Sequence, residues 1–502
     1  MVCGTASDVG KSRLVAGLCR LLARRGVRVA PFKAQNMALN SFVTDAGDEI
    51  GRSQASQAAA AGVEPEAAMN PILLKPTGAD VSQVVVMGRA TGHVDFAHYR
   101  AQAPELRAVV HEALAGLRRR YDVVVCEGAG GAAEINLLDD DLVNLPLARD
   151  AGIPAILVGD IERGGVFAAL HGSLDLLPPS LRAPVRGLVI NKMRGDASML
   201  AAGIEELERR HGIPTLGIVP YVEGIFLDAE DSLALARPWP PALHADADHD
   251  ADVRDAPGGL DVAVVGLPHM ANFTDLDPLA AEPGVRLRLV TSAALGDPDL
   301  VVIPGTKATV SDLGWMERAG IADAVRAAHR RADGPVVMGL CGGFQMLGGS
   351  IDDTVESGTG RRAGLGLLDV DTVFEATKVT RRCQGVALGA PLHGYQIHHG
   401  RVHRRAGASP WVALDDGAVT EDEGCRAPDG RVLGTSLHGL FEDDRFRAAL
   451  LAEVARLRGR HHRESSVDFA AVRREQFDVV ADVLEASLDL AALEAIIAGG
   501  VS

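Results

Sequence analysis

Residues 4–12 read GTASDVGKS, and an amphipathic helical pattern follows directly over residues 12–25. A glycine-rich turn at the start of a helix directs backbone N–H groups toward phosphate oxygens. In such a loop Lys11 would reach the β- and γ-phosphates of a nucleotide, and the Ser12 hydroxyl would bind Mg²⁺. We therefore expect the ATP-binding residues of the loop to be Thr5, Gly10, Lys11 and Ser12.

The start of this loop departs from the common pattern in two ways. Thr5 occupies the first position of G-x-x-x-x-G-K-[ST], and Gly4 lies one residue earlier. Only residues 1–3 precede the loop, although a phosphate loop ordinarily follows a buried strand. We expect either a longer first strand encoded upstream of this start or a fold that tolerates a very short one. A plain glycine-rich turn with an incidental Lys-Ser pair is the alternative.

A carboxylate at the end of a neighbouring strand should complete a phosphate site. Residues 121–131 read YDVVVCEGAGG, so the apolar run delivers Glu127 to the carboxyl edge of the sheet, where open α/β sheets bind ligands. Glu127 is thus a candidate Mg²⁺ ligand, or alternatively a helix cap. Asn191 follows another apolar run and is a candidate contact to the nucleotide base, or alternatively a turn residue.

Short apolar runs alternate with helical patterns through most of the chain, which predicts an α/β fold with doubly wound parallel sheets. The clearest strand predictions are Val123–Cys126, Ala155–Val158, Gly187–Ile190, Val262–Val265, Leu300–Ile303 and Val336–Leu340. Residues 237–259 are rich in Pro, Asp, Ala and Gly and have the composition of a linker, or less simply of a metal-binding Asp/His tract. We expect domains at 1–236 and 260–450, the linker at 237–259, and a helical extension over 451–502, for example Val479–Ile497.

The composition excludes several classes of protein. A formal net charge of -17 argues against a nucleic-acid partner. No run approaches the roughly 18 apolar residues of a membrane-spanning helix, and no signal peptide pattern is present at the start. Six cysteines without a C-x-x-C pair favour a reducing compartment. We expect a cytoplasmic protein that acts on small molecules without a membrane partner.

The second domain contains a candidate nucleophile. Residues 335–347 read PVVMGLCGGFQML, an apolar strand, a tight turn at Cys341 and a helix start. The flanking glycines permit a strained elbow that exposes the thiol, and the backbone N–H of Gly342 could stabilise an oxyanion. His438 is the candidate base, and the loop at Gly305 is placed to give a second oxyanion donor. The alternatives are an inert buried cysteine and, as competing bases, His398 and His399.

The motifs of the first domain resemble the ATP-dependent amidoligases related to dethiobiotin synthetase. They are GTASDVGKS, PFKAQNM over residues 31–37, and CEGAGG over 126–131. The resemblance implies a phosphate-loop domain that uses ATP to phosphorylate a carboxylate. It also implies that Lys33 binds the acyl phosphate or the substrate carboxylate. Where those enzymes have an acidic second Mg²⁺ ligand, this sequence has Gln54.

The motifs PGT, GLCGGFQ and T-x-x-H-G of the second domain resemble class I glutamine amidotransferase domains. That resemblance implies release of ammonia from glutamine through a γ-glutamyl thioester on Cys341. Typical members have a glutamate two residues after the histidine, where this chain has Leu440. The similarity therefore implies a Cys341–His438 dyad, with Glu442 as the candidate helper.

The combination of the two domains resembles the cobalamin-pathway amidotransferases. Several segments are similar to the cobyric acid synthase family in particular: FKAQNMALNSFVT over 32–44, MNPILLKP over 69–76, GDIERGGVFA over 159–168, LDAEDSL over 227–233 and LPHMANFTDLDPL over 267–279. The resemblance implies ATP- and glutamine-dependent amidation of the b, d, e and g carboxylates of a corrinoid polycarboxylate, adenosylcobyrinic acid a,c-diamide, with Mg²⁺. Cobyrinic acid a,c-diamide synthases and, further away, partitioning-type ATPases are the alternatives. The motifs do not determine the oligomeric state, and a homo-oligomer is one of the alternatives.

Overall fold

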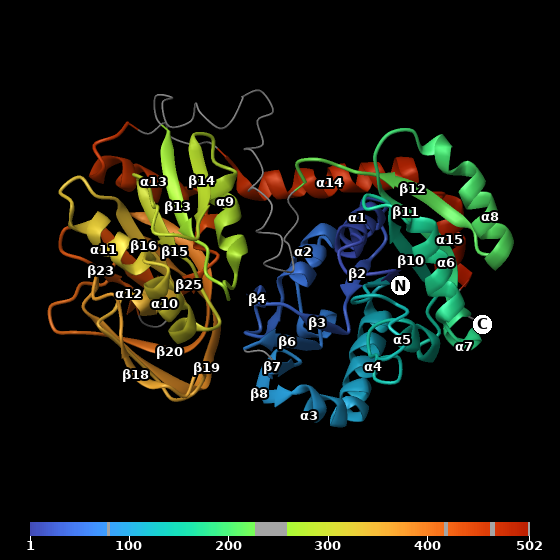
Figure 1. The fold of residues 1–502 in the computed structure, drawn as a ribbon, viewed down its shortest axis with the longest axis horizontal. Coiled ribbons are helices and arrows are strands. Elements are labelled where there is room, and N and C mark those ends of the chain that lie inside the picture. Colours follow the sequence, from blue (N-terminus) through green and yellow to red (C-terminus); the bar gives the residue numbers. More distant parts are fainter. Residues whose placement is uncertain (78–80, 226–258, 416–419, 462–466, 500–502) are drawn as a thin grey trace. The chain divides into compact units, whose positions relative to one another are not determined.

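The computed structural model describes residues 1–77, 81–225, 259–415, 420–461 and 467–499. They form two compact units whose segments alternate along the chain (Figure 1). Unit 1 comprises Met1–Ala38, Glu49–Asp228 and Arg473–Ser502, and unit 2 comprises Leu39–Asp48 and Ala229–Val472. None of the described helices combines the length and the hydropathy that a membrane crossing requires.

Unit 1 is built on a parallel sheet whose central strands are mostly buried. Its main sheet has the order β1-β10-β11-β12, and a bridge between Val2 and Glu127 joins β1 to the end of β9, which pairs with β2. A second, mixed sheet has the order β3-β6-β7-β8. The strands are β1 (Val2–Gly4), β2 (Val29–Phe32), β3 (Gln35–Met37), β5 (Glu49–Gly51), β6 (Ile72–Pro76), β7 (Val81–Val86), β8 (Arg89–Asp95), β9 (Val123–Cys126), β10 (Ala155–Asp160), β11 (Val185–Met193) and β12 (Thr215–Pro220).

Helices cover the sheets of unit 1. They are α1 (Lys11–Arg24), α2 (Arg52–Ala61), α3 (Phe96–Ala101), α4 (Ala103–Arg120), α5 (Leu145–Asp150), α6 (Val166–Leu176), α7 (Pro179–Arg182) and α8 (Ala201–His211), with short 3-10 turns η1 (Ala67–Met69) and η2 (Ala197–Leu200). Two more, α14 (Phe469–Ser487) and α15 (Leu490–Gly499), come from the carboxyl-terminal end of the chain. The parallel α/β fold agrees with the prediction.

The carboxyl-terminal helices pack on unit 1, shown in red in Figure 1. Leu14 and Leu18 of α1 share one buried cluster with Leu484 of α14, and a Cβ on Gly17 would lie 2.6 Å from a Leu484 methyl group. Arg20 donates to Asp478 of α14 at 2.7 Å. The helix that follows the phosphate loop is therefore covered by α14, which lies more than 440 residues further along the sequence.

The structure divides the predicted carboxyl-terminal helix of 479–497 in two. Leu488 forms a bridge with Gly217 of β12, and the Asp489 backbone N–H donates to Leu216 O at 2.7 Å. The Asp489 carboxylate then accepts the N–H of Ala492 at 3.0 Å and caps α15. Backbone pairing with the sheet thus interrupts a pattern that reads as one helix. The predicted linker, apart from Gly259, lies outside the described residues.

Unit 2 contains a six-stranded sheet of order β14-β13-β15-β16-β24-β23, parallel except for β23. A second sheet has the order β18-β17-β19-β20-β25; β21 pairs with β19 at its side, and β22 pairs with β21. The strands are β4 (Ser41–Val43), β13 (Leu260–Val265), β14 (Val285–Val290), β15 (Leu300–Ile303), β16 (Val336–Leu340), β17 (Ser350–Asp353), β18 (Gly360–Ala363), β19 (Val370–Ala387), β20 (Ala390–Arg404), β21 (Val412–Asp415), β22 (Thr420–Glu423), β23 (Cys425–Arg426), β24 (Val432–Thr435) and β25 (Leu437–His438). The helices are η4 (Phe273–Leu276), α9 (Asp277–Ala280), α10 (Thr309–Arg318), α11 (Ile321–Arg330), α12 (Gly342–Leu347), η5 (Leu440–Glu442) and α13 (Asp444–Leu457).

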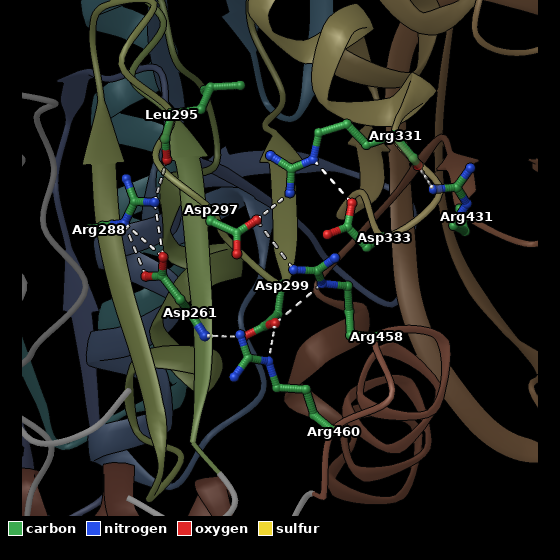
Figure 2. Close-up of polar contacts among 10 residues, drawn as sticks. All are labelled: Asp261, Arg288, Leu295, Asp297, Asp299, Arg331, Asp333, Arg431, Arg458 and Arg460. Carbon is green, nitrogen blue, oxygen red and sulfur yellow. Dashed lines mark hydrogen bonds and ion pairs between the residues drawn. The ribbon is translucent and has the colours of Figure 1, made fainter. Parts of the chain in front are cut away.

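An ion network lies at the amino edge of the six-stranded sheet (Figure 2). Asp299, fully buried just before β15, accepts from Arg460 at 2.6 Å and from Arg458 at 3.3 Å. Its other oxygen accepts the backbone N–H of Asp261 at 3.0 Å, and Asp261 in turn pairs with Arg288. The network fastens the end of α13 to β13, β14 and β15. Because it lies at the edge opposite to the carboxyl ends of the strands, it is structural.

Candidate active sites

The phosphate loop of unit 1 joins β1 to α1 through two left-handed residues. Asp8 has φ 63° and Gly10 has φ 98°. A Cβ on Gly10 would lie 2.3 Å from Asn191 Nδ2, so only glycine fits there. The same Nδ2 donates to Val9 O at 2.7 Å, which places the predicted base contact against the loop backbone. The backbone N–H of Thr5 donates to Val158 O of β10 at 2.9 Å and so extends the sheet pairing.

Lys11 is buried at the mouth of this loop. Its Nζ donates to Ala6 O at 3.0 Å and to Gly130 O at 2.8 Å. Gly130 belongs to the glycine-rich turn after β9, so the predicted loop and the predicted carboxylate strand do meet. Neutral carbonyl oxygens are weaker partners for an ammonium than phosphate oxygens. Lys11 thus places a positive charge next to the loop, where its ammonium group can pair with a bound anion.

Glu127 lies directly after β9 and collects three donors. Its Oε1 accepts from Ser12 Oγ at 2.8 Å and from Lys33 Nζ at 2.9 Å, and its Oε2 accepts from Gln57 Nε2. Lys33 and Glu127 are 3% and 1% exposed, so this ion pair is almost completely desolvated. A buried ion pair gives little net stability, which favours a functional reason for it. The structure thus brings together Ser12, Lys33 and Glu127.

Gln57, which the motifs did not single out, is the amide next to this carboxylate. Gln54, the predicted replacement for an acidic ligand, instead accepts from Asn36 at 3.0 Å and donates to Ser53 at 2.7 Å. Within the described residues, the buried Oε1 of Gln57 has no hydrogen-bond partner. One turn of α2 separates the two glutamines, and that spacing is the signal that could have drawn attention to Gln57.

A Mg²⁺ ion fits the donors of this site. Magnesium prefers oxygen and is usually held by one or two protein carboxylates together with substrate phosphates. Ser12 Oγ, the Glu127 carboxylate and the unpartnered Gln57 Oε1 are such oxygens. The described residues contain no cluster of three or more His, Cys, Asp or Glu side chains for a metal cage. These oxygens therefore suit a Mg²⁺ ion that is also bound by the phosphates of a nucleotide.

In unit 2, Cys341 occupies the elbow between β16 and α12. Its φ of 48° and ψ of -105° are strained for a residue with a side chain, and its N–H donates to Thr435 O at 2.7 Å. A Cβ on Gly342 would lie 2.7 Å from the Thr306 methyl group, and one on Gly343 would lie 1.9 Å from Ile303 O. The two glycines are needed because the loop after β15 presses against the elbow.

His438 lies at the end of β25 and is held by an acid that the sequence motifs did not identify. Its Nδ1 lies 2.6 Å from Asp275 Oδ2, and Asp275 Oδ1 accepts the N–H of Gly439 at 2.8 Å. The Cys341 side chain also interacts with the imidazole, and it raises the pKa of His438. Asp275, and not Glu442, contacts the histidine. The two residues are separated by 163 positions, so no local pattern around His438 could have pointed to it.

The charges around His438 favour its protonated form. Burial by itself would lower the pKa of the imidazole, but the Asp275 carboxylate and the Cys341 sulfur outweigh burial and raise the pKa to about 10. Gly305 lies beside the ring, since a Cβ there would be 2.7 Å from His438 Cε1. The arrangement can remove a proton from Cys341 and return it to a leaving group.

Each of the two alternative histidines hydrogen-bonds to a backbone carbonyl group. His398 Nδ1 lies 2.7 Å from Gly400 O, and His399 Nδ1 lies 3.0 Å from Glu375 O. Burial lowers the pKa of His398 to about 3 and also lowers the pKa of His399. Among the histidines considered, His438 is the one that combines an acid partner with a contact to Cys341.

Two family models match the chain. One describes a CobQ/CobB/MinD/ParA nucleotide binding domain and matches residues 1–234, and the other describes a CobB/CobQ-like glutamine amidotransferase domain and matches residues 261–446. These matches agree with the predicted order of an ATP-using domain followed by a glutamine amidotransferase domain.

Curated relatives match along the whole chain. The cobyric acid synthase of Rhodococcus jostii (strain RHA1) is 52% identical, over 100% of this chain and 95% of the relative. The cobyric acid synthases of Nocardia farcinica (strain IFM 10152) and Frankia casuarinae are 49% and 50% identical, each over 100% of this chain and 96% of the relative. With this identity over its full length, the chain belongs to the cobyric acid synthase family of glutamine-dependent amidating enzymes of cobalamin biosynthesis.

Proposed function

We propose that the protein amidates the b, d, e and g carboxylates of adenosylcobyrinic acid a,c-diamide to give adenosylcobyric acid, with ATP and glutamine as co-substrates. The single observation that carries the ammonia-releasing half is the Cys341–His438–Asp275 array on a strained elbow. The family resemblance supports the choice of corrinoid carboxylates. The substrates are therefore small molecules: a corrinoid polycarboxylate, glutamine and ATP.

In unit 2, glutamine hydrolysis proceeds through a thioester. His438 accepts the Cys341 proton while Asp275 stabilises the imidazolium. The sulfur attacks the carboxamide carbon of glutamine, and backbone N–H groups around Gly305 and Gly342 are proposed to bind the oxyanion. His438 then protonates the leaving ammonia, and water hydrolyses the γ-glutamyl thioester to release glutamate and regenerate the thiol.

In unit 1, a substrate carboxylate oxygen attacks the γ-phosphorus of ATP, and ADP leaves. Lys11 would compensate the charge of the transferred phosphoryl group, and Lys33 would bind the carboxylate or the acyl phosphate; the contact of Lys33 with Glu127 and the contact of Lys11 with the turn after β9 support these roles. Bound Mg²⁺, held by Ser12, Glu127 and Gln57 Oε1, would neutralise phosphate charge. Ammonia attacks the acyl carbon, phosphate leaves, and the amide is formed.

Mass spectrometry of the reaction with the corrinoid diamide, ATP and glutamine tests the proposal. We expect successive conversion of carboxylates to amides, one glutamate and one ADP per amide formed, and amidation at b, d, e and g by fragmentation or NMR. Amidation at a and c of the unamidated corrinoid instead would contradict the proposed substrate. Failure to release glutamate from glutamine would contradict the proposed thiol chemistry.

A further inference from the structure

Residues Leu39–Asp48 are part of unit 2, although their neighbours Ala38 and Glu49 belong to unit 1. This segment, called here the 39–48 loop, contains β4 and a turn in which the Thr44 N–H donates to Asp48 O at 2.9 Å. It lies within the stretch matched by the nucleotide binding domain model. β4 pairs with β5, but several residues of the loop contact residues around the proposed glutaminase triad.

A reciprocal pair of asparagines joins the loop to the turn that carries Asp275. Asn40 Oδ1 accepts the backbone N–H of Phe273 at 3.0 Å, and Asn272 Oδ1 accepts the backbone N–H of Ser41 at 2.8 Å. Asn40 and Asn272 are 0% and 3% exposed, so both bonds are shielded from water. Buried bonds of this kind are costly to leave unmade.

The pair replaces an ordinary helix cap. Asn272 is the N-cap residue of η4, in a left-handed conformation with φ 52°, but its side chain makes no hydrogen bond within that turn. Instead, the side-chain oxygen of Asn40, in the 39–48 loop, accepts the backbone N–H of Phe273, the first residue of η4. Asp275 lies two residues further along η4. The position of its carboxylate therefore depends on a residue more than two hundred positions away in the sequence.

The same loop also supports His438 from the side of the ring. Tyr395 of β20 donates its hydroxyl to Ser41 O at 3.0 Å, and its ring stacks on the His438 imidazole with centroids 5.5 Å apart. The Phe42 ring lies against Tyr395 with centroids 5.7 Å apart, and Val43 shares a buried cluster with Tyr395. The loop thus contacts both the turn that carries Asp275 and the tyrosine that stacks on His438.

We propose that Asn40, Asn272 and Tyr395 are positioning residues of glutamine hydrolysis, with the 39–48 loop as an integral part of the glutaminase site. The inference rests on the proposed function, in which His438 and Asp275 activate Cys341. The asparagine pair fixes η4 so that the Asp275 carboxylate meets His438 Nδ1, and Tyr395 fixes the plane of the ring. None of the three acts on the substrate directly.

The test compares two activities of the full-length chain. Asn40→Ala and Asn272→Gly each remove one acceptor, and glycine still tolerates the left-handed backbone of position 272. We expect glutamate release, as kcat/KM for glutamine, to fall about 10- to 100-fold, because displacement of a catalytic group by about 1 Å has effects of this size. Ammonia-dependent amidation should stay within about twofold of the unsubstituted protein. Tyr395→Phe, which retains the ring, should lose less.

A pH profile separates positioning from simple destabilisation. The groups that face His438 are Asp275 of η4, Cys341 of the elbow, and His398 and Tyr395 of β20. If η4 shifts, Asp275 stabilises the imidazolium less, so the alkaline limb of glutamate release should move to lower pH in Asn40→Ala. Asn40→Asp retains an oxygen acceptor at the start of η4 and should recover most of the activity.

Asp45→Asn is the matched control. Asp45 is in the same loop but is exposed and paired with Arg382, so this variant should match the unsubstituted protein in both activities. Unchanged glutamate release in Asn40→Ala and Asn272→Gly, or equal loss of both activities, would overturn the inference while leaving the proposed function intact. Absence of glutamate release from the unsubstituted protein would instead overturn the proposed function.

Discussion

The thiol site and the phosphate site differ in how their charged side chains are held. At the thiol site each member of the proposed triad contacts the next, from Asp275 through His438 to Cys341. At the phosphate site the Lys11 ammonium rests on two carbonyl oxygens, and a Gln57 oxygen has no partner within the described residues. The thiol site is assembled by contacts within the fold, whereas the phosphate site still presents a buried oxygen, Gln57 Oε1, that a ligand could engage.

Because the two sites are separate groups of residues, we expect substitutions at them to cause different losses of activity. A change at the phosphate site should remove synthesis from any nitrogen source, because no amide forms without the acyl phosphate. A change at the thiol site should remove only the use of glutamine. The following substitutions test this separation, beginning with the largest expected loss of activity.

Lys11→Ala should abolish amidation with glutamine and with ammonium alike, by about 10³-fold or more, because the charge on the transferred phosphoryl group is no longer compensated. Corrinoid amide formation and ADP release are measured with each nitrogen source. Glutamate release without the other substrates should continue, since no triad member changes. Retained ATP-dependent amidation would disprove the role of the phosphate loop.

Cys341→Ala should abolish glutamine-dependent amidation and glutamate release but leave ammonium-dependent amidation within severalfold. The sulfur is the nucleophile that attacks glutamine in the proposed hydrolysis, and alanine tolerates burial at the elbow. Amide formation is measured with glutamine and then with ammonium chloride at alkaline pH. Equal loss with both nitrogen sources would show that the two sites are not separable in this way.

Asp275→Asn should reduce glutamate release on the order of 10²- to 10⁴-fold, because an amide can present its N–H to Nδ1 and fix the wrong imidazole tautomer. The folded protein holds the pKa of His438 at about 10, above its ordinary value, so the imidazolium persists at neutral pH and is lost as the pH rises through about 10. Without the Asp275 charge that pKa falls, and the alkaline limb of the pH profile should move to lower pH. Rates of glutamate release across pH check both effects. An unchanged limb would exclude Asp275 as the partner of His438.

Asp299→Asn should have the smallest effect on activity and a clear effect on stability. The substitution removes the charge that Arg458 and Arg460 share at the amino edge of the sheet, and we expect unfolding of unit 2 to become easier by about 3 kcal/mol. Chemical denaturation measures the loss, and both amidation activities below the transition should be unchanged. A selective loss of glutamate release would place this network in the chemistry after all.

The sequence predicts those parts of the sites that are coded locally. The strand runs identify Glu127 and Cys341 because each directly follows its strand, and the glycine-rich loop after β1 identifies Lys11 at the start of α1; the carboxyl edge of a parallel sheet gathers such residues. Asp275 and Gln57 escape this reasoning. Asp275 meets His438 only through a pairing across 163 positions, and Gln57 faces Glu127 from the third residue after the expected Gln54.

The assignment of segments to units could not be read from composition either. The loop of residues 39–48 belongs to unit 2 although both its neighbours in the sequence belong to unit 1. The helical residues from Arg473 onward belong to unit 1 although they follow unit 2 in the sequence. Their contacts depend on single buried amides and on small residues such as Gly17, which carry no periodic signal. Local patterns fix what each segment forms, and long-range pairing fixes where it packs.

The covering of α1 by α14 has a consequence for synthesis on the ribosome. Arg20 and Asp478 are separated by 458 positions, so at about 5–20 residues per second the apolar face around Gly17 waits about 20 to 90 s for its partner. During that time the helix next to the nucleotide loop is exposed on the nascent chain. Unit 1 thus gains this cover only after α14 has been synthesised, so a chain that stops before α14 would leave the apolar face of α1 exposed.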